Sequence, residues 1–357
     1  PKPSSAASDV YKRQDFDLDD VAELAEIERE TVHDVKAVEY YLKRRLTAVV
    51  GDDDAKGLAE LIHFACTSED INNLSYALMV QGATQQVWLP RATALVEAIA
   101  TMARDLKDVP LLAHTHGQPA TPTTMGKELA VLAHRLGRQV RRIERAEYLG
   151  KINGATGTYG AHTAAVPSTD WVAVSQSFVE SLGLTWNPLT TQIESHDWQA
   201  ELYADIARFN RILHNLCTDV WTYISMGYFA QVRGQGTVGS STMPHKVNPI
   251  RFENAEANLE VSNALLDVLA STLVQSRLQR DLTDSSMQRN IGTAFGHSLL
   301  AIDNAGRGLA GLDAVPEAMA ADLDANWEVL GEPIQSAMRA LGAQGVPGME
   351  QPYERLK

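Results

Sequence analysis

Three long segments of this sequence carry apolar residues at the spacing of an α-helix. They run from Thr121 to Leu149, from Ala200 to Gln231 and from Ile250 to Leu273. A continuous helix over the first segment would extend about 43 Å, a length typical of a large helical bundle. Because no strand-like alternation competes with this pattern in the middle of the chain, the sequence predicts an all-α protein whose core is a bundle of long helices.

The composition describes a soluble, globular chain. Its 357 residues suffice for two or three domains, and 45% of them are hydrophobic while 21% are charged. No apolar run has the length of a membrane span and no signal-peptide core is visible at the start, which favours the cytoplasm. The net charge of −14 argues against binding to nucleic acid. Cys66 and Cys217 form no CxxC motif and are expected to be buried free thiols.

Changes in composition along the chain suggest where domains begin. Residues 1–14 are small, polar and basic, and we interpret them as a disordered or non-native remnant. The acidic run at 51–54 resembles a turn between domains. We therefore expect an N-terminal helical domain over 15–56, the long-helix bundle over 57–310 and a C-terminal helical domain over 311–357.

A polar, glycine-rich stretch, Gly234–Pro249, precedes the third helical segment. It presents hydroxyls, an imidazole, an ammonium and an amide, and Asn248 and Pro249 have the residue types that cap and open a helix. The glycine spacing also fits a dinucleotide fingerprint, but that motif needs a preceding strand and an immediate helix. A plain flexible surface loop is the other simple interpretation.

The eleven residues Gly239–Pro249 are similar to the signature of the fumarase/aspartase superfamily, whose members are helical lyases that release fumarate. The wider match, which continues through Asn254, resembles the adenylosuccinate lyases within that superfamily. This resemblance implies that Ser240 is the catalytic base, with its alkoxide favoured by nearby positive charge and N–H donors. The substrate-binding residues that it implies in this stretch are Ser241, Lys246, Val247, Asn248 and Asn254.

A second motif contains two histidines, His114 and His116, followed by Gly117. The His-x-His spacing could suggest a metal site, but no carboxylate or cysteine lies at ligand spacing, so no metal is expected. Thr121 and Pro122 then have the residue types that cap and start a helix. By resemblance to the superfamily's second motif, His116 is the acid that protonates the departing nitrogen.

Two more segments have both a structural and a functional interpretation. Thr67 with Asp70 three residues later resembles a helix-start capping arrangement, and a helix N-terminus also binds carboxylate or phosphate well. By resemblance, Thr67 and Ser68 contact the substrate. His33 and Asp34, in a segment expected to open a helix, contribute to the same pocket by resemblance, although the family has Asn where Val32 stands here.

The glycine-rich segment Lys151–Gly160 would by default be a solvated crossover, whereas the family places a similar loop near the active site. A helical region is expected to start at Thr190–Glu194, within which Gln192 is a substrate contact by resemblance. The segment Ser276–Asn290 contains arginines and serines that suit a phosphate. Its agreement with the family's phosphate-binding segment selects Arg280, Ser285 and Arg289.

Together these motifs imply a lyase that converts adenylosuccinate to AMP and fumarate and also acts on the succinylocarboxamide ribotide of purine synthesis. The resemblance further implies a homotetramer in which each active site draws on three chains, with a nucleotide substrate and without a cofactor. The chain resembles a copy that lacks both ends. Two alternatives remain: a sister lyase acting on argininosuccinate or aspartate, and a catalytically silent helical assembly.

Overall fold

The computed structural model describes residues 16–231, 243 and 246–357. The expected remnant at 1–14 and the predicted site residues Ser240 and Ser241 lie outside the described residues. The chain divides into two compact units. Unit 1 takes in the chain up to Tyr76 together with residues 149–194, and unit 2 takes in residues 77–148 and 195–357.

Unit 1 begins with a pair of helices, α2 (Leu18–Thr31) and α3 (Asp34–Val50), followed by α4 (Asp52–Ala59). The two helices are joined by polar contacts around Asp20, which accepts a hydrogen bond of 2.7 Å from the Tyr41 hydroxyl and forms an ion pair with Arg45. The acidic run expected to form a turn is instead helical from Asp52, because α4 begins directly after Gly51.

The rest of unit 1 consists of the first turns of α5 (Ser68–Gly82), the short helix α8 (Gly160–Ala165) and α9 (Trp171–Ser181). A two-residue parallel pairing connects β3 (Leu149–Gly150) with β4 (Thr185–Trp186). His162 of α8 is only 4% exposed and its ring lies 4.9 Å from that of Trp171, centroid to centroid. Burial lowers the pKa of His162 below its usual value.

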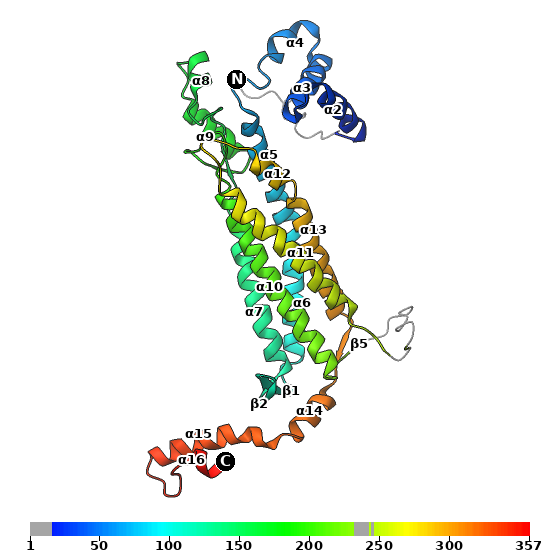
Figure 1. The fold of residues 1–357 in the computed structure, drawn as a ribbon, viewed down its shortest axis with the longest axis vertical. Helices are drawn as coiled ribbons and strands as arrows, with labels where there is room; N and C mark the ends of the chain where they lie inside the picture. The colour runs from blue at the N-terminus through cyan, green and yellow to red at the C-terminus, as the bar shows by residue number, and fades with distance from the viewer. Residues whose placement is uncertain (1–15, 232–242, 244–245) are drawn as a thin grey trace. The chain divides into compact units, whose positions relative to one another are not determined.

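Unit 2 is a bundle of long helices packed side by side (Figure 1). Its members are α6 (Leu89–Asp105), α7 (Met125–Glu144), α10 (Asp197–Ser225), α11 (Ile250–Leu273) and α13 (Ile291–Leu309). A π-helical turn, η1 (Ala83–Trp88), leads into α6. Of the apolar stripe predicted for α7, Leu129, Leu132, Leu136 and Ile143 are buried in the core, whereas Val140 is half-buried. The expected bundle of long helices is confirmed.

The centre of the bundle contains four connected polar side chains, which we call the polar ladder: Trp88, Ser298, Asn210 and Ser262. Trp88 Nε1 donates to Ser298 Oγ at 2.9 Å, and that hydroxyl donates to Asn210 Oδ1 at 2.8 Å. Asn210 Nδ2 donates to Ser262 Oγ at 3.1 Å, and Ser262 in turn donates to the carbonyl of Ala294 at 2.8 Å. All four side chains are fully buried, so these bonds remove most of the cost of placing polar groups in an apolar core.

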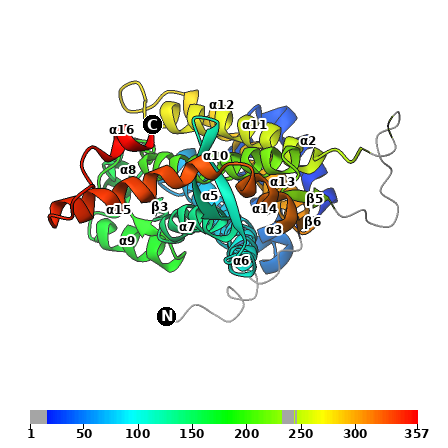
Figure 2. The same cartoon turned by 90° about the horizontal axis from the view of Figure 1, so that it is seen from below.

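Short strands and helices lie at the ends of the bundle. At one end β1 (Pro110–Thr115) and β2 (Gln118–Thr124) form an antiparallel hairpin, which faces the viewer in Figure 2. At the same end β5 (Phe229–Gln231) pairs with β6 (Leu312–Ala314), which leads into α14 (Pro316–Asp324) beside β1. The remaining elements are α12 (Thr283–Gln288), the 3-10 turn η2 (Trp327–Leu330), α15 (Gly331–Ala343) and α16 (Pro352–Leu356).

The hairpin corrects the expected start of the first long helix. Thr121 and Pro122 lie in β2 rather than at a helix start, and α7 has 20 residues beginning at Met125. Thr124 is the actual N-cap, whose side chain accepts a hydrogen bond from Lys127 N at 3.1 Å. A two-stranded hairpin has only edge strands, where proline is tolerated, so Pro122 is compatible with the strand.

Two other helix starts also differ from expectation. Residues 190–196 form bends and irregular structure, and α10 begins only at Asp197 and ends at Ser225. Helix α11 begins at Ile250, with Pro249 at the N-cap position and no side-chain cap, so Asn248 does not cap it. No described helix is long and apolar enough to cross a membrane.

Candidate active site

The N-terminus of α5 carries two of the predicted substrate contacts, Thr67 and Ser68. Half of the expected capping arrangement is present: the carboxylate of Asp70 accepts a hydrogen bond of 2.9 Å from Thr67 N, but the Thr67 hydroxyl takes no part. Within the described part of the chain, neither the Thr67 nor the Ser68 hydroxyl has a hydrogen-bond partner. Both side chains are half-buried, so their hydroxyls are available to a ligand at a helix N-terminus, which favours anions.

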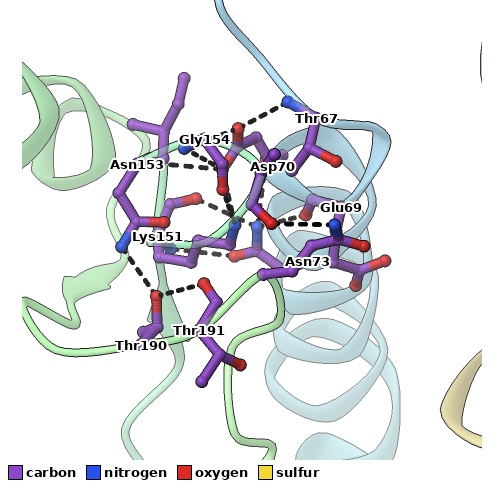
Figure 3. A network of polar contacts seen from close by, with 12 residues as sticks. Thr67, Glu69, Asp70, Asn73, Lys151, Asn153, Gly154, Thr190 and Thr191 are labelled. Carbon is purple, nitrogen blue, oxygen red and sulfur yellow. Dashed lines mark hydrogen bonds and ion pairs between the residues drawn. The ribbon is translucent and has the colours of Figure 1, made fainter. Parts of the chain in front are cut away.

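Behind these hydroxyls lies a buried ion pair between Asp70 and Lys151, shown in Figure 3. Lys151 Nζ donates to Asp70 Oδ1 at 2.7 Å, and both side chains are 0% exposed. Asn153 N and Gly154 N also donate to this carboxylate, each at 3.1 Å. The start of the glycine-rich segment is therefore packed against α5 and is not a solvated crossover.

Gln192 joins the same cluster through the glycine-rich segment. Its Nε2 donates to the carbonyl of Ala155 at 2.9 Å. Asn153 Nδ2 donates to Thr190 Oγ1 at 2.7 Å (Figure 3). Gly157, at a φ of +75°, lies so close to Thr190 that a Cβ atom would be 2.2 Å from its carbonyl oxygen. Hydrogen bonds through Asp70, Gly154 and Ala155 thus connect Thr67, the neighbour of Ser68 in the chain, with Gln192.

His33 and Asp34 lie elsewhere in unit 1, at the start of α3. His33 is the N-cap, and its Nδ1 accepts a hydrogen bond of 3.3 Å from Lys36 N. Its side chain is 50% exposed and that of Asp34 is 58% exposed. His33 thus caps α3 and is half exposed, and the binding role of this pair stays a prediction.

The predicted acid, His116, is at the turn of the β1–β2 hairpin in unit 2. It adopts a φ of +55° and Gly117 a φ of +73°, so two successive left-handed residues reverse the chain. The side chain of His116 is exposed, as is that of His114. Neither histidine lies with two further described His, Cys, Asp or Glu side chains at metal-ligand spacing.

The described part of the signature stretch lies at the same end of unit 2 as this hairpin. Gln231 of β5 donates from Nε2 to the carbonyl of Val247 at 2.7 Å, which fixes the chain just before α11. Lys246 and Asn248 are exposed on either side of half-buried Val247. Asn254 lies one turn into α11, where its Oδ1 accepts from Asn304 at 2.9 Å.

The predicted phosphate contacts lie around α12. Arg280 Nη2 is 3.9 Å from Asp284 Oδ1, and the same oxygen accepts from Ser285 N at 2.7 Å. His196, the residue before α10, has its Nε2 3.4 Å from Asp284 Oδ2. Burial would raise the pKa of Asp284, but the His196 hydrogen bond and the charge of Arg280 outweigh it and lower the pKa. Arg289 is exposed at the end of α12.

Within unit 2 these two groups of residues lie at opposite ends of the bundle (Figure 1). Lys246 and Asn248 precede α11, whereas Arg280 follows it, and the 24 residues of that helix span about 36 Å. His116 lies at the Lys246 end, because α14 joins β6 to the side of β1. Unit 2 therefore does not bring the predicted acid and the predicted phosphate contacts of one chain together.

Comparison with known proteins identifies the family. Residues 5–261 match a family described as Lyase, and residues 276–357 match one described as Adenylosuccinate lyase C-terminal. The chain is 52% identical to the adenylosuccinate lyase of Escherichia coli K12, over 96% of this chain and 73% of that protein. This chain belongs to the adenylosuccinate lyase family. The adenylosuccinate lyase of Vibrio cholerae is 51% identical over the same shares of the two chains.

Solved structures share the fold of this adenylosuccinate lyase family member. A fumarate lyase from Mesorhizobium sp. BNC1 has a TM-score of 0.79 at 18% identity, covering 99% of this chain and 77% of that one. The 3-carboxy-cis,cis-muconate lactonizing enzyme of Pseudomonas putida has a TM-score of 0.75 at 20% identity, covering 96% and 73%. These likenesses support the mostly helical bundle architecture.

For an adenylosuccinate lyase, the buried residues behind the predicted contacts were not foreseen from the sequence. The sequence predicts Asp70 only as a capping residue and Lys151 only as part of a loop. The sequence also gives no sign of the roles of Asp284, which contacts Arg280 and Ser285, and of His196, which contacts Asp284. The available signal was the pairing of Thr67 with Asp70 in a segment rich in small polar residues. Ion pairs between residues 81 positions apart, such as Asp70 and Lys151, leave no local pattern.

Proposed function

We propose that this chain catalyses the elimination of fumarate from adenylosuccinate, leaving AMP, and from the succinylocarboxamide ribotide of purine synthesis, leaving the free carboxamide. The observation that carries the proposal is the 52% identity, over nearly the whole chain, to a protein named adenylosuccinate lyase. We place the reaction in the cytoplasm, and we expect it to need no cofactor.

The chemistry requires a base, an acid and a site for negative charge. In the proposed reaction Ser240 takes the proton from the carbon beside a carboxylate, and the electron pair left behind forms the double bond of fumarate. The C–N bond breaks as His116 protonates the departing nitrogen. Lys246 and Asn248 hold the carboxylate on which charge accumulates. The exposed position of His116 on a tight turn supports this role, because a substrate can reach the ring.

The nucleotide phosphate is assigned to Arg280, Ser285 and Arg289. Asp284 supports this assignment, because its ionised carboxylate contacts the Arg280 side chain and the Ser285 backbone and so restricts both. A guanidinium beside a hydroxyl suits a phosphate dianion, which accepts charge-assisted hydrogen bonds. Thr67, Ser68 and Gln192 would contact other polar groups of the substrate, and His33 and Asp34 would contribute to the same pocket.

We further propose that the protein acts as a homotetramer with sites shared between chains. The separation of His116 from Arg280 by the length of α11 supports this, because a nucleotide is far shorter than about 36 Å. Exposed apolar side chains on the bundle helices, including Val131, Trp221, Val261, Val268 and Leu300, supply apolar surface for association. Light scattering that found a stable monomer with full activity would contradict this proposal.

The substrate test measures fumarate release by the protein, with any flanking sequence of its gene included, from four compounds. These are adenylosuccinate, the succinylocarboxamide ribotide, the phosphate-free nucleoside of adenylosuccinate, and argininosuccinate. We expect turnover of the first two, weak turnover of the third at high concentration, and none of the fourth. Preference for argininosuccinate would indicate the sister lyase, and no turnover at all would indicate a catalytically silent assembly.

Sharing of sites between chains has its own test. His116→Ala and Arg280→Ala proteins, each impaired alone, are mixed, dissociated and reassembled. If one site takes His116 and Arg280 from different chains, some sites of the mixed tetramer are fully wild type and activity returns. Activity of the mixture equal to the average of the two separate variants would show that each site lies within one chain.

A further inference from the structure

We propose that Asp70 and Lys151 are positioning residues that fix the substrate-binding hydroxyls of Thr67 and Ser68 relative to Gln192. This inference rests on the proposed function and adds to it two residues that contact no substrate themselves. Both side chains are 0% exposed, so they act only through the backbone segments that they hold.

The carboxylate of Asp70 collects donors from two separate segments of unit 1. Oδ2 accepts from Thr67 N at 2.9 Å and from Gly154 N at 3.1 Å. Oδ1 accepts from Asn153 N at 3.1 Å and from Lys151 Nζ at 2.7 Å. One side chain thereby binds the first turn of α5 to the glycine-rich segment, as Figure 3 shows.

The link continues from the glycine-rich segment to Gln192. Ala155, the residue after Gly154, accepts through its carbonyl the hydrogen bond of Gln192 Nε2 at 2.9 Å. Thr67 and Gln192 are therefore connected through Asp70, Gly154 and Ala155. Any shift of the glycine-rich segment relative to α5 changes the distance between the two predicted substrate contacts.

Asn73, one turn along α5, reinforces the same junction. Its Oδ1 accepts from Lys151 N at 2.9 Å, and its Nδ2 donates to the carbonyl of Lys151 at 3.0 Å. The amide therefore pairs with both backbone groups of Lys151, which fixes the residue from which the ammonium extends. The Asp70 carboxylate, the Lys151 ammonium and the Asn73 amide are all paired in this buried network, whereas the nearby Asn153 Oδ1 has no hydrogen-bond partner among the described residues. A shift of the glycine-rich segment would leave further buried polar groups unpaired, which opposes such a shift.

The pair also explains why the Thr67 hydroxyl is available to a ligand. A Thr at the start of a helix ordinarily uses its hydroxyl to accept from a backbone N–H two or three residues later. Here Asp70 N donates to the carbonyl of Thr67 at 2.9 Å, and Asp70 satisfies Thr67 N in return. The first turn is closed without the hydroxyl. The charge that makes this arrangement possible in the interior is that of Lys151, because an unpaired buried carboxylate is strongly unfavourable.

The experiment compares Lys151→Met, Asp70→Asn and the double variant Asp70→Asn/Lys151→Met with the wild-type protein in steady-state assays on adenylosuccinate. Lys151→Met alone leaves a buried carboxylate unpaired and can fail to fold, whereas the double variant removes both charges and retains the shapes. We expect the folded double variant to raise KM at least tenfold while kcat per folded active site changes less than threefold. We expect this because the double variant displaces contacts that the substrate makes in the ground state, whereas Ser240 and His116 are unchanged.

The matched control is Lys43→Met, which removes another ion pair of unit 1, that between Lys43 and Glu39 at 3.1 Å. This variant should keep the wild-type KM. A purely structural role for Asp70 and Lys151 would lower the amount of folded enzyme and leave KM unchanged. A wild-type KM in the folded double variant, or an equal rise in Lys43→Met, would overturn the inference.

Amide hydrogen exchange tests the inference on the unmutated protein. The N–H groups of Asn153 and Gly154 lie outside any helix or strand, yet they should exchange as slowly as those of the α5 interior, because Asp70 holds them. Rapid exchange at both would overturn the positioning role. Failure of the wild-type protein to release fumarate from adenylosuccinate would instead contradict the proposed function, so the two failures are distinguishable.

Discussion

The carbonyl oxygen of Ala103 lies 2.3 Å from the position that a Cβ atom would take on Gly126. The end of α6 and the start of α7 therefore approach closer than any residue with a side chain would permit. Gly126 N uses this proximity to donate to the carbonyl of Leu106 at 3.0 Å. We expect Gly126→Ala to lower the free energy of unfolding by about 1–3 kcal/mol, as overpacking against backbone does, measured by denaturant unfolding.

The control for this prediction lies on the same helix. At Gly137 a Cβ atom would meet only side-chain atoms at 3.6 and 3.7 Å, which is ordinary contact. Gly137→Ala should therefore be neutral or stabilise α7 by roughly 0.5–1 kcal/mol, because alanine loses less backbone entropy on folding. Equal destabilisation by both substitutions would show that the close approach at Gly126 is not the cause.

The proposed acid and base predict a second result. His116→Ala and Ser240→Ala should each lower kcat by roughly 10²–10⁴-fold while the affinity for adenylosuccinate, measured by calorimetry on the inactive variants, stays within a few fold. Each residue acts on the proton that moves and not on the remote parts of the substrate. Near-normal turnover by either variant would remove that residue from its role.

Arg280 should behave in the opposite way. A phosphate contact far from the breaking bond is made in both the ground state and the transition state, so Arg280→Ala should raise KM and leave kcat nearly unchanged. Arg307→Ala is the control, because Arg307 is also ion-paired on a helix of unit 2, with Asp303 at 3.1 Å, and has no proposed substrate contact. A loss confined to kcat in Arg280→Ala would contradict the phosphate assignment.

Because His162 is buried, we expect the free energy of unfolding to depend on pH. Its pKa is lowered by burial from the usual 6.5, and no described residue hydrogen-bonds its Nδ1. The unfolded chain binds the proton more readily than the folded one, so folding stability falls as pH drops through about 6.5. His162→Phe should reduce the loss of unfolding free energy between about pH 7.5 and about pH 5.5. An unchanged loss in the variant would show that other groups account for it.

A chelator should leave activity unchanged. Each step of the proposed elimination is assigned to a side chain, and none requires a Lewis acid. The measurement is fumarate release before and after exhaustive dialysis against a chelator, with metal analysis of the dialysed protein. Activity lost on dialysis and restored by one divalent metal would contradict the proposed mechanism.

The sequence predicted the helices whose apolar stripe repeats over several turns, and it failed where short backbone pairings decide the structure. The stripe of α7 was correct, yet its start was misplaced because Thr121 and Pro122 satisfy the helix-start pattern as well as Thr124 does. The choice depends on β2 pairing with β1, a contact that local propensity cannot represent. The helical start expected at Thr190–Glu194 is likewise absent, because the conformation of Thr190 follows from packing against Gly157 and Asn153.

The sequence predicts individual residues of the candidate site from their motifs, but it does not predict the contacts between those motifs. Thr67 and Gln192 are predicted as substrate contacts from two separate motifs, and the structure connects them through Asp70 and Ala155. Nothing in the local pattern around Lys151 indicates that its ammonium is buried, because lysine ordinarily lies on the surface. The roles of Ser240 and Ser241 stay predictions.

The polar ladder allows only one position of the bundle helices along one another. Helices lined with leucine and alanine can slide past one another by a turn, about 5.4 Å, with little change in apolar contact. Such a slip of α13 would separate Ser298 from both Trp88 and Asn210 and would remove Ala294 from Ser262, leaving buried groups unsatisfied at every step. Leucines of the core can therefore be exchanged one at a time over evolution, whereas the ladder residues are expected to change only together.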